Sequence, residues 1–153
     1  MCDQSRRRLE RLVIFDGNCA FCSRFFRVSV ALLEGDNTAF VASGSETGQK
    51  ILRRLELPNQ PSTVYLVKRG GVLEKSSAVL DLYGEFRRPY CWLKALAILP
   101  RGFRDWGYDL IARWRRFLPG GNLSRCELSV KQQKFLIGDD NSDWAVVEDL
   151  LDS

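Results

Sequence analysis

Two cysteines separated by two residues are the side chains in this sequence best suited to chemistry. Cys19 and Cys22 follow an apolar run at residues 12–15 and an Asp16-Gly17 turn, and they open an amphipathic segment. A strand, a turn and a helix start in this order place Cys19 at a helix N-terminus. There the unpaired backbone N–H groups and the helix macrodipole favour a thiolate over a thiol. We therefore predict a redox dithiol with Cys19 as nucleophile and Cys22, one turn deeper, as resolving thiol.

Metal or haem chemistry is a weaker interpretation of the same pair. Zinc and iron–sulfur sites usually need four ligands, whereas Cys2, Cys91 and Cys126 are isolated and the chain has no histidine. Ser23 stands where a covalent haem motif requires histidine. We expect no cofactor and no metal. A pair of buried structural cysteines remains an alternative.

Asp16 admits two roles that do not exclude each other. A carboxylate close to the dithiol can take the proton of Cys22 and act as a general base. The same side chain can instead accept the backbone N–H of Asn18 or Cys19 in an Asx turn. The sequence leaves both roles open.

Length and composition indicate an ordinary soluble globular protein. The chain has 153 residues, of which 45% are hydrophobic and 27% charged. No stretch approaches the ~20 apolar residues of a membrane span, and residues 1–11 lack the apolar core of a secretory signal. We expect a cytoplasmic protein, and in that reducing compartment an isolated Cys-x-x-Cys is typically catalytic.

Charge is distributed unevenly along the chain. Residues 1–126 carry 21 Lys and Arg against 12 Asp and Glu, whereas residues 127–153 carry 2 against 7. A basic body with an acidic tail indicates either an acidic partner or a surface that pairs with itself, and we favour the second. No motif supports nucleic-acid binding.

The expected elements alternate between strand and helix up to residue 84. Apolar and β-branched runs predict strands at 12–15, 38–42, 63–68 and 72–74. Helices are expected at 19–34 with Asn18 as N-cap, after a capping box at 43–46, and after Ser76 or Ser77. This order is that of the thioredoxin fold, whose redox members carry Cys-x-x-Cys just after the first core strand. We predict an α/β fold with a thioredoxin-like four-stranded mixed sheet flanked by helices, plus a C-terminal helical hairpin.

The C-terminal part has two apolar helical segments, at about residues 89–118. A stripe at helical period predicts that this hairpin packs on the domain; its members are Phe103, Trp106, Leu110, Ile111, Trp114, Phe117 and Leu118. The alternative is an interfacial membrane helix flanked by arginines; these are Arg104, Arg113, Arg115 and Arg116. We divide the chain into a basic leader (1–10), the domain with its C-terminal helices (11–126) and an acidic tail (127–153). Residues 144–151 of that tail are amphipathic, so the tail is either flexible or a docked helix.

These motifs resemble the DCC family of thiol-disulfide oxidoreductases over about residues 11–128. The specific match is the motif at 15–22, aromatic-Asp-Gly-x-Cys-x-x-Cys. Weaker matches are the segments at 45–48, 76–80, 100–113 and 125–126. Ser77 departs from the family pattern, which often has an acidic residue there. The resemblance implies a thioredoxin-like fold and thiol-disulfide exchange.

The expected function is therefore thiol-disulfide oxidoreductase. Its partners would be protein or small-molecule thiols and disulfides, with a recycling reductant or oxidant; a membrane surface is a less favoured partner. In a thioredoxin-like fold, Pro61 is the candidate for the cis-proline opposite the dithiol, and the backbone of Ser62 beside it would receive the substrate. The alternative function is a non-catalytic interaction domain that docks a protein or membrane through its basic, aromatic C-terminal helices.

Overall fold

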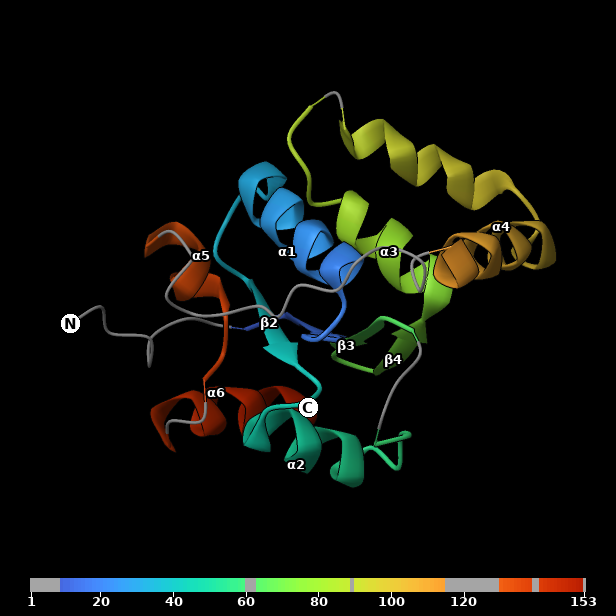
Figure 1. The fold of residues 1–153 in the computed structure, drawn as a ribbon. Helices are drawn as coiled ribbons and strands as arrows, with labels where there is room; N and C mark the ends of the chain where they lie inside the picture. Colours follow the sequence, from blue (N-terminus) through green and yellow to red (C-terminus); the bar gives the residue numbers. More distant parts are fainter. Residues whose placement is uncertain (1–8, 60–62, 89, 115–129, 139–140, 153) are drawn as a thin grey trace.

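A computed structural model describes residues 9–59, 63–88, 90–114, 130–138 and 141–152. Four strands form one mixed sheet in the order β2-β1-β3-β4 (Figure 1). The strands are β1 (Arg11–Phe15), β2 (Thr38–Ala42), β3 (Tyr65–Lys68) and β4 (Gly71–Glu74). β2 runs parallel to β1, and the β1–β3 and β3–β4 pairs are antiparallel. The predicted four-stranded mixed sheet is confirmed.

Helices cover both faces of this sheet. α1 (Ala20–Leu32) and α3 (Lys75–Tyr83) lie on one face, and α2 (Glu46–Arg54) and α6 (Asn141–Leu151) lie on the other (Figure 1). The side chains of β1 alternate between two buried clusters, with Val13 and Phe15 on the α1 side and Leu12 and Ile14 on the α2 side. A strand buried on both faces must be apolar throughout, as this one is. The arrangement is the thioredoxin-like α/β fold that the sequence predicts.

Three phenylalanine rings hold α1 on the sheet. Phe26 of α1 stacks on Phe15 of β1 with ring centroids 5.5 Å apart, and it meets Phe40 of β2 edge-on at 5.1 Å. All three side chains are fully buried. Burial of one phenylalanine contributes ~1.5–3 kcal/mol, and aromatic pairs in these orientations add ~0.5–1.5 kcal/mol each. The start of α1 is therefore firmly positioned.

α2 begins at a different serine from the one expected. The N-cap is Ser45 and not Ser43, because the Ser45 hydroxyl accepts the backbone N–H of Gly48 at 3.0 Å. Gly48 must be glycine, since a Cβ there would lie 2.1 Å from the carbonyl oxygen of Ala42. The Ser45 hydroxyl also donates to the carbonyl oxygen of Ala42 at 2.9 Å, which ties the cap to the end of β2.

α3 likewise starts earlier than its serines suggest. Its N-cap is Glu74, so Ser76 and Ser77 lie within the first turn, while Gly84 ends the helix as predicted. Ser76 is buried and uses its hydroxyl to donate to Asp105. A tertiary contact occupies the side chain that would otherwise cap the helix.

The C-terminal segment packs on the domain. After α5 (Val130–Phe135), the backbone N–H of Ile137 donates to the carbonyl oxygen of Phe40 at 2.7 Å, which covers the outer edge of β2. Val147 and Leu150 of α6 are buried against the α2 face. Of the two alternatives for residues 144–151, the docked helix is therefore observed.

Acidic residues of this segment pair with the basic body. Arg54 forms ion pairs with Glu148 and Asp152, and Arg69 pairs with Asp149 at 3.4 Å. These contacts agree with the expectation of a surface that pairs with itself. Each exposed pair is worth little alone, ~0–1 kcal/mol.

The predicted C-terminal hairpin differs from expectation in two respects. Residues 90–98 form a 3-10 helix, η2 (Tyr90–Ile98), and α4 (Arg101–Trp114) follows it; both contact α3. The predicted packing of these helices on the domain is confirmed. Most of the described aromatic stripe on α4 nevertheless faces outward, because Trp106 is 64% and Trp114 72% exposed. The last stripe members, Phe117 and Leu118, lie outside the described residues. Within the described part of the chain, no helix has the length and apolar character needed to cross a membrane.

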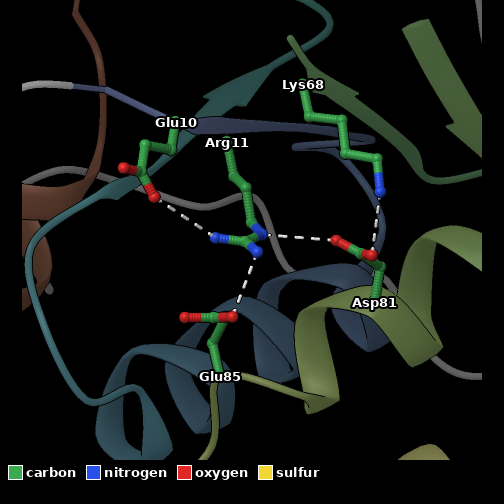
Figure 2. A network of polar contacts seen from close by, with 5 residues as sticks. All are labelled: Glu10, Arg11, Lys68, Asp81 and Glu85. Atoms are coloured by element: carbon green, nitrogen blue, oxygen red, sulfur yellow. Dashed lines mark hydrogen bonds and ion pairs between the residues drawn. The ribbon is translucent and has the colours of Figure 1, made fainter. Parts of the chain in front are cut away.

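A polar network fixes α3 against the sheet (Figure 2). Arg11 of β1 and Lys68 of β3 are direct cross-strand neighbours, an arrangement that is unfavourable for like charges. Asp81 of α3 resolves it by accepting from Arg11 Nε at 3.2 Å and Lys68 Nζ at 3.0 Å. Arg11 also pairs with Glu85 at 3.0 Å and Glu10 at 3.8 Å. Burial raises the pKa of Asp81, but hydrogen bonds from Lys68 and Arg11 outweigh it, so the pKa lies below its ordinary value.

Substitution Asp81→Asn tests this network. It leaves Arg11 and Lys68 facing each other, so we expect it to lower the free energy of unfolding at pH 7 by about 1 kcal/mol. Because the folded-state pKa is lowered, the carboxylate stabilises the fold above the unfolded pKa of about 3.9, and this gain disappears as pH falls below it. Urea unfolding at neutral and acidic pH measures both effects. Asp149→Asn, at an exposed ion pair, is the control and should change little. Equal stability of Asp81→Asn and wild type at pH 7 would contradict the prediction.

Candidate functional site

The turn before α1 is organised by Asp16. Its Oδ1 accepts the backbone N–H of Asn18 at 3.0 Å, and its carbonyl oxygen accepts the N–H of Cys19 at 3.3 Å. This is the Asx turn expected as one of the two roles of Asp16. Because the turn includes Asn18, the predicted N-cap at Asn18 is wrong. Cys19 itself is the N-cap residue, with extended backbone dihedrals of −96° and 119°.

The two cysteines differ in exposure. Cys19 is half-buried, whereas Cys22 is only 2% exposed and packs within the same core as Phe26. Neither cysteine forms a disulfide. The Cys19 carbonyl oxygen accepts both the N–H of Ser23 at 2.9 Å and its hydroxyl at 3.1 Å, which fixes the first turn of α1. The Cys19 side chain makes no capping hydrogen bond, so its sulfur is not engaged with the N–H groups of that turn.

An apolar pocket of about 120 Å³ opens beside Cys22. Three helices and the residue before β3 line it: Phe21, Cys22, Phe25, Val64, Val79, Tyr83, Tyr108, Ile111 and Ala112. An apolar cavity of roughly this size has room for a benzene-sized group. Burial raises the pKa of the Tyr83 phenol, which therefore stays neutral at physiological pH. The pocket offers a small apolar group a place next to the inner sulfur.

Tyr108 of α4 is a pocket residue that the sequence interpretation did not single out. Its hydroxyl accepts the backbone N–H of Val64 at 3.1 Å and lies 2.9 Å from the hydroxyl of Thr63. This anchors α4 to the segment that leads into β3. The sequence did contain one signal for this inward contact. Tyr108 lies on a different side of the helix from the aromatic stripe.

Several sequence-predicted residues are not placed. Pro61, Ser62, Cys126 and Cys2 lie outside the described residues, and the side chain of Cys91 in η2 is not described. Of the predicted set, the structure describes Asp16 in the turn before α1, Cys19 at its N-cap and Cys22 in its first turn. Within the described ranges, no group of three or more His, Cys, Asp or Glu side chains could hold a metal ion.

Comparison with known proteins gives two matches. A family model described as DCC1-like thiol-disulfide oxidoreductase matches residues 13–121. The uncharacterized protein YuxK of Bacillus subtilis (strain 168) is 27% identical over 119 residues, which cover 77% of this chain and 86% of that protein. No solved structure gives a significant match. The family match spans the turn, both cysteines, the pocket and α4.

The Asx turn gives a prediction for Asp16. Asp16→Asn keeps an oxygen that accepts the Asn18 N–H, so its stability should stay within about 0.5 kcal/mol of wild type. Asp16→Ala removes the acceptor and should cost about 1 kcal/mol. Urea unfolding of the two variants provides the comparison. If Asn and Ala lower stability equally, the turn does not depend on this hydrogen bond.

Proposed function

Because the chain belongs to the DCC1-like thiol-disulfide oxidoreductase family, we propose that it exchanges disulfides through Cys19 and Cys22. The observation that carries this proposal is the difference in exposure between the two cysteines at the start of α1. The partly exposed Cys19 can contact a substrate, while the buried Cys22 lies one helical turn farther along α1. Cys2, Cys91 and Cys126 have no partner at this spacing in the sequence.

The first step is an attack by the outer thiolate. Cys19 Sγ bonds to one sulfur of the substrate disulfide, the substrate S–S bond breaks, and the departing thiolate takes a proton from solvent. The position at the N-cap supports this role, since the free N–H groups and the macrodipole of α1 favour negative charge there.

The second step releases the substrate. Cys22 loses its proton and attacks Cys19 Sγ; the mixed disulfide breaks, and the second substrate thiolate leaves and is protonated. Two electrons have passed from the dithiol to the substrate, and the protein holds a Cys19–Cys22 disulfide. We propose Asp16 as the base that receives the Cys22 proton, because its carboxylate stands in the turn directly before the dithiol.

Substrates are proposed to be protein or small-molecule disulfides with an apolar group beside the sulfur. The pocket next to Cys22 supports this preference. Pro61 and Ser62 remain predicted substrate contacts, since Val64, two residues after Ser62 in the sequence, lines the pocket. A thiol reductant or disulfide oxidant would restore the starting state, and the proposed compartment is the cytoplasm.

Redox titration of the full chain tests the proposal. After equilibration in glutathione buffers, free thiols are alkylated and counted by mass spectrometry. We expect a reversible two-electron transition at a potential between roughly −270 and −120 mV, the range of dithiol proteins. Cys19→Ser and Cys22→Ser should each abolish it, and Cys126→Ser should retain it. A pair that never oxidises contradicts the proposal and favours the non-catalytic interaction domain. A transition that survives both substitutions also contradicts it and would assign the redox chemistry to other cysteines.

The same chain allows the two steps to be timed separately. With an aromatic disulfide that releases a coloured thiol, the first release reports attack by Cys19 and the second reports resolution by Cys22. Asp16→Asn keeps the turn, so it should leave the first release unchanged. If Asp16 is the base, the second release slows by at least about tenfold at neutral pH. Unchanged second release would leave Asp16 with its structural role alone.

A further inference from the structure

α4 packs on the domain through both polar and apolar side chains. Asp105 accepts a hydrogen bond from Ser76, and Asp109 pairs with Lys75 at 3.5 Å. Tyr108 bonds to the backbone of Val64, and Tyr108, Ile111 and Ala112 line the pocket. A surface helix of a globular protein normally turns its apolar stripe inward. In α4 the largest apolar side chains are instead exposed.

The apolar side of α4 faces outward. Phe103, Trp106, Leu110 and Trp114 recur at intervals of three and four residues, so they form one stripe along the helix. They are 63%, 64%, 45% and 72% exposed. The rings of Phe103 and Trp106 lie 6.1 Å apart, which makes this end of the stripe continuous. Large exposed apolar patches mark interaction sites.

The charge around the stripe is basic. Both acidic residues of α4, Asp105 and Asp109, are engaged with the domain. Arg101 and Arg113, near the two ends of α4, are exposed. The exposed side chains of α4 thus include tryptophan, phenylalanine, leucine and arginine.

We propose that α4 is an interfacial helix that docks the protein on an anionic membrane surface. Tryptophan and phenylalanine settle at the boundary between headgroups and acyl chains, while arginines attract anionic lipid, and a helix need not span the bilayer to bind this way. The proposal goes beyond disulfide exchange. Because Tyr108, Ile111 and Ala112 of the same helix line the pocket beside Cys22, docking brings the dithiol next to the membrane surface.

Vesicle flotation of the full chain tests this surface. We expect the protein to float with phosphatidylcholine–phosphatidylglycerol vesicles at low salt and much less at high salt or with phosphatidylcholine alone. Tryptophan fluorescence should shift to the blue on binding, and brominated lipids should quench it. The double variant Trp106→Ser/Trp114→Ser should weaken binding by at least about tenfold. The double variant Arg101→Gln/Arg113→Gln should weaken binding to anionic vesicles about tenfold or more, because each arginine is attracted to the anionic headgroups.

Two controls separate this surface from the rest of the molecule. Val28→Ser, at an exposed apolar position on α1, should bind vesicles like wild type. Cys19→Ser should also bind normally, so membrane docking and disulfide exchange can fail independently. The proposal is overturned by absence of flotation, by equal binding to neutral vesicles, or by α4 variants that bind like wild type. Self-association lost in Trp106→Ser/Trp114→Ser, without vesicle binding, would instead assign the stripe to a second copy of this chain.

Discussion

The position of the two cysteines depends on how α1 packs against the sheet. Phe26 inserts between Phe15 and Phe40, so the helix is held on β1 and β2 by three buried rings. The same inward face carries Cys22, one turn before Phe26. With that face buried, the N-cap position of Cys19 lies at the edge of the core, where its side chain is partly buried. The chemistry proposed for the pair therefore rests on hydrophobic packing.

Much of this arrangement could be predicted from the sequence, because the relevant signals are local. The apolar run at 12–15 predicts a strand buried on both faces, and the 3–4 residue spacing of Cys22, Phe26 and Val30 predicts which side of the helix faces inward. The strand at 38–42 agrees with the observed bounds of β2. The order of these elements was sufficient to indicate the fold.

The predictions that differ from the structure concern features that are decided by contacts between residues far apart in the sequence. Ser43 and Ser45 both suit a helix cap, and it is the Ser45 hydroxyl that meets both the Gly48 N–H and the Ala42 carbonyl oxygen. The aromatic stripe of α4 shows that the helix is amphipathic, but not which side faces the domain. That orientation depends on Tyr108 meeting Val64 and on Asp109 meeting Lys75. No local pattern contains these contacts.

α4 connects the proposed site with the surface of the molecule. Its inner side closes the pocket next to Cys22, and its outer side presents aromatic rings and arginines. On the opposite face of the sheet, α6 buries Val147 and Leu150 and pairs its acidic residues with Arg54 and Arg69. The acidic residues of this segment thus neutralise Arg54 and Arg69, which lie outside α4.

The most direct test of the account is the reactivity of each sulfur in the reduced, folded protein. A short pulse of iodoacetamide at neutral pH, followed by peptide mass spectrometry, gives the modification rate of every cysteine separately. We expect Cys19 to be alkylated at least about tenfold faster than Cys22, because of these two only Cys19 is both partly exposed and placed at the helix N-terminus. Equal rates, or faster modification of Cys22, would contradict it.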